Sequence, residues 1–270
     1  MNWIVDTYIL ESRSTIGDLL SAIRDSGSNL HTTKYVPFAD EQDYGPKEFV
    51  NGPTILYGTV GYVRKCKIPF MPGALGVGEE MNCNHYYANL PAEDMLNQPF
   101  IMMPFAQVKH WINDLLYTFD GKFFLRPNAG SKTFTGMVIT KDNHEHELSA
   151  TQQITSVSPE TICLLSKVQS LKGEFRFVVG GGEVIDGSEY RWDDVLDIRR
   201  DYPEECKALA EKIAKHSWQP DIVYCVDVAL TENNGPKVIE LNSFSSAGLY
   251  ACDKRLVVDR VNEIVIKEYW

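Results

Sequence analysis

Hydrophobic residues along the chain recur with two spacings, one helical and one strand-like. Helical spacing places Ile16, Leu19, Leu20 and Ile23 on one stripe and predicts a helix running towards Ser26–Gly27. Further helices are predicted over 105–119, after Asp201, and from about residue 253. Short apolar runs bounded by turn residues predict strands at 54–57, 61–63, 122–125, 136–140, 161–169, 174–179, 183–186, 222–230 and 237–241. Strands and helices mixed in this order predict an α+β fold of several lobes, rather than one doubly wound sheet.

Composition and charge narrow the functional classes. The chain has 270 residues with 37 acidic against 26 basic side chains, and its formal net charge is −11. This balance, with no basic run, argues against a general nucleic-acid-binding surface. The apolar runs fall far short of the ~20 residues that span a bilayer, so no membrane segment is expected. The six cysteines form no C-x-x-C pair. We therefore expect a soluble, cytoplasmic protein with reduced thiols.

An acidic strand pair at residues 223–243 carries the most chemical information. Asp227 lies among Val, Cys and Ala, where an unpaired charge is costly to bury. Glu240 and Asn242 are two residues apart, so they share one face of the following strand. If the two strands pair antiparallel across their short turn, three oxygen-bearing side chains converge. Such oxygen ligands suit Mg²⁺.

The alternative is that these residues are ordinary polar positions of a half-exposed hairpin. The two interpretations differ in stability. If Asp227 and Glu240 ligate a metal, replacing them with their amides leaves the metal-free fold as stable or more stable, because carboxylate repulsion is relieved. If they are structural, each has a hydrogen-bonded or cationic partner, and the same change destabilises the fold.

The string from Asp227 to Ser243, D-V-A-L-T-E-N-N-G-P-K-V-I-E-L-N-S, resembles the C-terminal metal-binding motif of the ATP-grasp superfamily. The resemblance implies that Asp227, Glu240 and Asn242 hold Mg²⁺ ions that bridge the phosphates of ATP. It extends over residues 98–270, which it identifies as an ATP-grasp domain with two α+β lobes gripping ATP. Residues 1–97 match loosely, as a small N-terminal α/β lobe. Compact ATP-grasp proteins of bacteria and phages are the relatives that it suggests.

Two further segments resemble the nucleotide-binding parts of that family. Phe123–Gly136 (FFLRPNAGSKTFTG) is similar to its phosphate-covering loop, with Arg126 where most members have Lys, so Lys132 is expected to share the phosphate role. Taken alone, this segment is equally consistent with an ordinary hairpin carrying solvated charges.

Leu164–Gly182 resembles the hinge that meets adenine. The resemblance implies that Lys167, Val168 and Gln169 border the base. It also implies that Glu174 contacts the ribose or the base and that Arg176 contacts the γ-phosphate or an acyl phosphate. The alternative for Glu174 and Arg176 is a cross-strand ion pair.

The resemblance implies an ATP-dependent carboxylate–amine or carboxylate–thiol ligase that acts through an acyl phosphate, with Arg176 and Lys132 as catalytic residues. The substrates would be a small-molecule or peptide carboxylate and an amine or thiol acceptor. Two rivals stay open: a non-catalytic or regulatory ATP-binding protein, and a small-molecule phosphotransferase. The sequence leaves the substrates and the oligomeric state open. His144 and His146 invite a zinc interpretation, but their polar stretch is expected to be a solvated turn.

Overall fold

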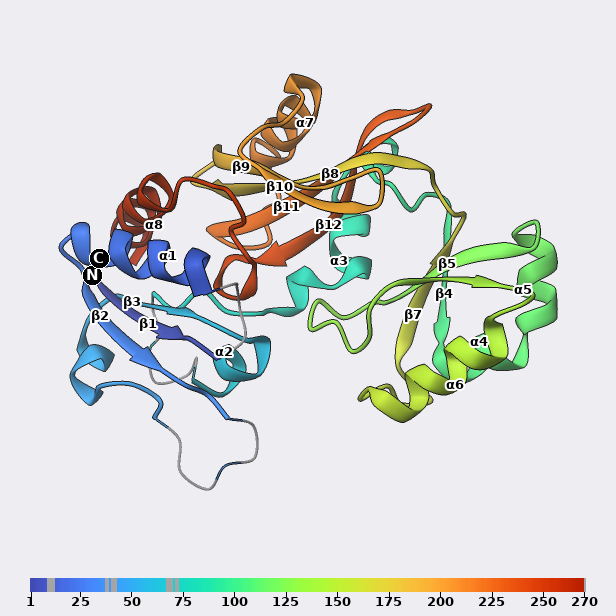
Figure 1. The fold of residues 1–270 in the computed structure, drawn as a ribbon, viewed down its shortest axis with the longest axis horizontal. Coiled ribbons are helices and arrows are strands. Elements are labelled where there is room, and N and C mark those ends of the chain that lie inside the picture. Colours follow the sequence, from blue (N-terminus) through green and yellow to red (C-terminus); the bar gives the residue numbers. More distant parts are fainter. Residues whose placement is uncertain (9–12, 37–38, 40–42, 67–69, 71–72, 270) are drawn as a thin grey trace. The chain divides into compact units, whose positions relative to one another are not determined.

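The computed structural model describes all residues except 9–12, 37–38, 40–42, 67–69, 71–72 and 270 (Figure 1). The chain divides into two compact units: residues 1–78 together with 171–270, and residues 79–170. The middle of the sequence thus forms one unit, while its two ends form the other. This division concerns packing, and the boundary after residue 97 stays a prediction. No helix of the described residues is long and apolar enough to cross a membrane.

The N-terminal part of the first unit is a three-stranded parallel sheet. Its strands are β1 (Asn2–Asp6), β2 (Asn29–Thr33) and β3 (Thr54–Tyr57), in the order β2-β1-β3. The predicted helix is present as α1 (Arg13–Asp25), with Leu19 and Ile23 buried.

The strand expected at 61–63 is wrong, because these residues belong to helix α2 (Val60–Cys66). Thr59 Oγ1 accepts a hydrogen bond from the Tyr62 N–H at 3.2 Å. This is the contact that caps a helix start. The buried residues Tyr62, Val63 and Cys66 then follow helical spacing. The apolar run is too short for its period to distinguish a strand from a helical turn.

A five-stranded antiparallel sheet forms the rest of the first unit. It consists of β8 (Leu171–Gly180), β9 (Glu183–Trp192), β10 (Val195–Arg199), β11 (Val223–Thr231) and β12 (Gly235–Ser243), in the order β10-β9-β8-β11-β12. Gly181 and Gly182 join β8 to β9 with φ of +61° and +82°. Two positive φ angles in a two-residue turn match the twist of a β-hairpin, so the predicted hairpin is confirmed.

Helices α7 (Glu204–Ala214) and α8 (Lys254–Tyr269) complete this unit. α7 packs against the five-stranded sheet, whereas α8 contacts both α1 and the sheet strands β8 and β9. One apolar core joins the two sheets, and it includes Trp3, Tyr57, Val178, Val223 and Phe244. Phe244, just after β12, meets Trp3 edge-on at 6.2 Å between ring centroids. The end of β12 is therefore fixed against the N-terminal sheet.

The second unit is built on a four-stranded antiparallel sheet. Its strands are β4 (Phe100–Pro104), β5 (Lys122–Pro127), β6 (Met137–Thr140) and β7 (Ile162–Ser166), in the order β4-β7-β5-β6. Its helices are α3 (Cys83–Asn89), α4 (Phe105–His110), α5 (Ile112–Thr118) and α6 (His144–Ile154). Short 3₁₀ turns lie at Lys47–Asn51, Glu79–Met81, Ala92–Asp94 and Phe244–Ser246.

Two sequence predictions in this unit need correction. The helix expected over 105–119 breaks at Trp111, which has non-helical dihedrals between α4 and α5 and is 49% exposed instead of lying on the apolar stripe. The solvated turn expected at His144–His146 is the first turn of α6. Asn143 Oδ1 accepts the Thr140 N–H at 2.7 Å and closes a turn before the helix. The buried Leu148 and Thr151 then hold α6 in place.

Candidate active site

The acidic strand pair has the register that the sequence predicts. Asp227 on β11 lies opposite Glu240 on β12, and Cys225 lies opposite Asn242. Asp227 is 1% exposed and Glu240 is 9% exposed. Asn242 Nδ2 donates to Asp227 Oδ2 and to Glu240 Oε1, both at 3.0 Å. The three predicted metal ligands therefore converge on one face of the sheet.

Arg176 on the neighbouring strand β8 lies opposite Asp227. Its Nε donates to Asp227 Oδ1 and its Nη2 to Asp227 Oδ2, each at 2.7 Å, which is a bidentate, charge-assisted ion pair. The guanidinium is buried and also donates from Nη1 to the Gly248 carbonyl at 3.0 Å. Burial alone lowers the pKa of Arg176, but the Asp227 carboxylate outweighs burial and holds that pKa above its usual value.

Asp227 thus has the cationic partner that a structural role predicts, while it also lies in the ligand set. For Asp227 the two interpretations of the sequence are not exclusive. Glu240 accepts a bond from the Asn242 amide, an interaction that does not depend on its charge. Glu240 is therefore the better residue for separating the two roles.

Glu174 lies two residues before Arg176 on β8. Its Oε2 accepts the Tyr190 hydroxyl at 2.7 Å, and its Oε1 lies 3.5 Å from Arg191 Nε. The cross-strand ion pair considered from the sequence is thus present. Burial raises the pKa of Glu174, the Tyr190 hydrogen bond and Arg191 lower it, and the Asp227 and Glu240 carboxylates raise it further. Glu174 therefore shares an electrostatic environment with the proposed ligands.

An aromatic pair borders Arg176. Tyr190 and Tyr250 are stacked with their ring centroids 4.9 Å apart and their planes at 15°. The Arg176 guanidinium carbon lies 5.0 Å from the Tyr250 centroid and 5.8 Å from that of Tyr190, within cation–π range. The sequence did not point to Tyr190. It lies where the β8–β9 register shifts, between Glu174↔Arg191 and Phe175↔Glu189, so alternation does not predict its face.

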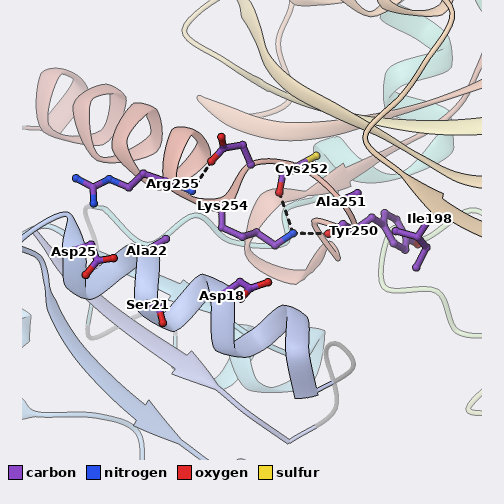
Figure 2. A pocket seen from close by; sticks show the side chains of 11 residues that line it. Asp18, Ser21, Ala22, Asp25, Ile198, Tyr250, Ala251, Cys252, Lys254 and Arg255 are labelled. Atoms are coloured by element: carbon purple, nitrogen blue, oxygen red, sulfur yellow. Dashed lines mark hydrogen bonds between the residues drawn. The ribbon is translucent and has the colours of Figure 1, made fainter.

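The loop that carries Tyr250 is held at several points. Tyr250 has φ of +44°, a left-handed conformation that costs a non-glycine residue about 1–3 kcal/mol. The buried Lys254 Nζ donates to the carbonyls of Tyr250 and Cys252 (Figure 2). Ser188 Oγ accepts the Ala251 N–H at 3.1 Å. These contacts fix the Tyr250 ring beside Arg176. A pocket of about 520 Å³, lined in part by α1, lies next to this loop.

Arg126 and Lys132 lie in the second unit. Arg126 is on β5 and is buried, unlike the solvated arginine of an ordinary hairpin, whereas Lys132 is exposed and has φ of +51°. The loop between β5 and β6 is anchored at its root by Asn128, which exchanges hydrogen bonds with Asn84 at 2.8 Å. A Cβ on Gly130 would lie 2.8 Å from the Met81 carbonyl oxygen. Glycine is therefore needed where the loop passes this backbone.

Lys167, Val168 and Gln169 directly follow β7, where the chain leaves the second unit and continues into β8. Lys167 Nζ lies 3.6 Å from Asp120 Oδ2, and both side chains are largely exposed, so this pair contributes little stability. Ser166 Oγ donates to Asn97 Oδ1 at 3.1 Å and to the Lys167 carbonyl at 3.4 Å. The predicted hinge residues thus connect the two units, while Glu174, Arg176, Asp227, Glu240 and Asn242 lie together in one.

The residues present fit a magnesium ion by their chemistry. Two carboxylates and an amide oxygen form the donor set, and Mg²⁺ is commonly held by one or two carboxylates together with substrate phosphates. Among the described residues no group of three or more His, Cys, Asp or Glu side chains is arranged to hold a metal alone. A metal at Asp227, Glu240 and Asn242 would therefore complete its coordination with phosphate and water.

Comparison with known proteins identifies the family. Residues 102–260, more than half of the chain, match the model of a family described as an ATP-grasp domain. The chain belongs to this family, and its fold is the ATP-grasp fold. No curated protein sequence matches it significantly.

Solved structures agree on the fold. A RimK domain ATP-grasp protein from Sphaerobacter thermophilus matches with a TM-score of 0.65 at 14% identity, over 98% of this chain and 100% of that one. The D-alanine–D-alanine ligase of Bacillus anthracis complexed with ATP matches with a TM-score of 0.59 at 13% identity, over 99% and 97%. The D-cycloserine synthetase DcsG gives 0.58 at 12% identity, over 96% and 99%. At these identities the likeness is one of fold.

Proposed function

We propose that this protein is an ATP-dependent ligase that joins a carboxylate to an amine or a thiol through an acyl phosphate. The observation that carries the proposal is the cluster of Asp227, Glu240, Asn242 and Arg176 on one sheet face of an ATP-grasp chain. Structural neighbours named as ligases or synthetases support a joining reaction over simple phosphotransfer. The acid is a small molecule or a peptide in class, and the acceptor supplies nitrogen or sulfur.

Two transfers make up the reaction. An oxygen of the substrate carboxylate attacks the γ-phosphorus of ATP, the bond to the β–γ bridging oxygen breaks, and ADP leaves. The acceptor nitrogen or sulfur then attacks the acyl carbon, phosphate leaves with the bonding electrons, and the acceptor loses a proton. Both steps need positioned reactants and offset negative charge more than they need a nucleophilic side chain.

The side chains have distinct roles in this proposal. The Arg176 guanidinium pairs with phosphoryl oxygens and offsets charge as the acyl phosphate forms. Lys132 and Arg126 bind phosphate from the loop and the strand before it, and Lys167, Val168 and Gln169 border adenine. Glu174, held by Tyr190, accepts hydrogen bonds from the ribose. Asp227, Glu240 and Asn242 would hold Mg²⁺, which when bound supplies positive charge to the phosphates.

The test is ADP release with Mg²⁺ and ATP across a panel of amino acids, small acids and short peptides. A ligase gives ADP, inorganic phosphate and a condensed product only when a matching acid and acceptor are both present. A phosphorylated small molecule in place of a condensed product identifies a phosphotransferase. ATP binding without turnover under any combination identifies a regulatory ATP-binding protein.

Lys132→Ala is expected to weaken ATP binding while leaving the fold nearly intact, because the side chain is exposed. A hydrogen bond to a charged group contributes about 1.5–3 kcal/mol, so we expect an increase in the ATP dissociation constant of roughly ten- to a hundredfold. Calorimetry with ATP measures it. Lys141→Ala, another exposed lysine of the same unit, is the matched control. Equal affinities in the wild type and both variants would remove Lys132 from the phosphate site.

A further inference from the structure

Both oxygens of Asp227 are engaged by Arg176, although Asp227 lies in the proposed ligand set. Oδ2 also accepts the Asn242 amide, whose Nδ2 reaches Glu240 as well. The two carboxylates and one guanidinium leave one net negative charge in a buried site. The ligand set is thus held together by its own donors: a cation on one side and an amide N–H₂ between the carboxylates.

A divalent cation that enters this arrangement alone meets two obstacles. With Arg176 still paired to Asp227, the metal and the guanidinium are like charges around a single carboxylate, and burial strengthens their repulsion. The ligand atom of Asn242 is Oδ1, yet its Nδ2 faces both carboxylates, so the amide must turn over before it can ligate. The metal therefore has to displace Arg176 without offering that arginine another anion.

A phosphate group removes the first obstacle and offsets the second. A guanidinium binds phosphate in the same bidentate manner in which it binds a carboxylate, so Arg176 has an equivalent partner to move to. Once Arg176 has left, Asp227 and Glu240 present two negative charges to a divalent cation, and the phosphate supplies further oxygen ligands. The Gly248 carbonyl and the Tyr250 ring, which both contact the guanidinium, keep it beside the site during this exchange.

We propose that Arg176 is a switchable counter-ion that keeps divalent cations out of the Asp227–Glu240–Asn242 set until a nucleotide phosphate arrives. This inference rests on the metal site of the proposed function and adds a rule for its use. Metal binding becomes conditional on nucleotide, and free cations do not fill the site. Arg176 is thereby a residue that determines binding specificity, in addition to its role towards phosphate.

Calorimetric titration with Mn²⁺ in the absence of nucleotide tests the proposal. The wild type is expected to show no binding at this site. Arg176→Met removes the charge but keeps an unbranched side chain, and is expected to gain Mn²⁺ affinity by about tenfold or more, the size typical of coupling between ligands. An Arg176 that only contacts phosphate predicts no such gain. Glu240→Gln combined with Arg176→Met should abolish the gain and so locate the ion.

Arg199→Met is the matched control, because Arg199 pairs with Glu189 and Asp197, outside the ligand set. If Arg176→Met folds only when Mn²⁺ is present, as circular dichroism would show, the metal has replaced the missing counter-ion and the proposal is supported. If it folds under neither condition, Arg176→Lys decides, since it keeps the charge without the bidentate fork. Stronger Mn²⁺ binding than in the wild type supports the proposal, and equal binding overturns it.

These titrations need neither ATP nor a substrate, so their outcome is separate from that of the ligase assay. A gain of Mn²⁺ affinity in Arg176→Met without ADP release in any substrate panel would retain the counter-ion role and reject the ligase. ADP release and condensation, with Mn²⁺ affinity unchanged in Arg176→Met and Arg176→Lys, would retain the ligase and reject the counter-ion role.

Discussion

Glu240→Gln is expected to reduce ATP-dependent turnover by about 10²–10³-fold, the loss seen when one preorganised charge-stabilising group is removed. Its stability without metal should be close to that of the wild type, because the glutamine carbonyl still accepts the Asn242 amide that Glu240 Oε1 accepts now. Turnover is measured as ADP release, and stability as the urea unfolding midpoint without divalent cations.

The matched control for this variant is Glu183→Gln at the start of β9, where the side chain is 69% exposed and pairs with Arg260. It should leave turnover unchanged. A Glu240→Gln protein that unfolds much more readily, yet has normal specific activity in its folded fraction, would show that Glu240 has a structural role. The metal site would then be lost, and the ligase proposal with it.

Asp227→Asn is expected to lose turnover and also to destabilise the metal-free fold by about 3–5 kcal/mol, the usual cost of removing one partner of a buried ion pair. The cause is Arg176, which is 6% exposed and would keep its charge without the carboxylate. This replaces the expectation that a ligand carboxylate can be neutralised without loss of stability. Urea denaturation without metal measures the change.

A double variant separates the cost of the stranded charge from other effects of the substitution. Asp227→Asn combined with Arg176→Met removes both charges, so it should recover much of the stability that Asp227→Asn alone loses. Equal stabilities of Asp227→Asn and the wild type would contradict the geometry of the pair. A double variant no more stable than Asp227→Asn would assign the loss to something other than the unpaired guanidinium.

Local patterns predicted much of this structure. The β11–β12 pair and the β8–β9 hairpin each join neighbouring segments through a short turn, so alternation and turn residues fix their register. The family match bears out the superfamily that the motif at 227–243 suggested. Contacts between distant segments were not predictable in the same way. Arg176 meets Asp227 because β8 lies beside β11, a pairing across 51 residues. Tyr190 was missed because a register shift breaks the alternation on β9.

The errors have a common physical basis. Residues 61–63 offer one apolar run that suits either a strand or one helical turn, and the Thr59 cap decides for the helix. The stretch at His144–His146 is polar throughout, so its helix depends on Leu148 and Thr151 further along. Tertiary packing overrides local propensity in both places. Assignments of individual site residues stay predictions, because geometry alone does not identify what Lys132, Glu174 or the hinge residues bind.

The formation of an acyl phosphate is the central claim, and trapping with hydroxylamine tests it most directly. Protein, ATP, Mg²⁺ and a panel of carboxylates are incubated with hydroxylamine, which attacks acyl phosphates in place of the natural acceptor. The account predicts a hydroxamate of the matching acid in equal amount to the ADP released, and none with Glu240→Gln. ADP release that yields a phosphorylated alcohol or amine, with no hydroxamate from any acid, would contradict it.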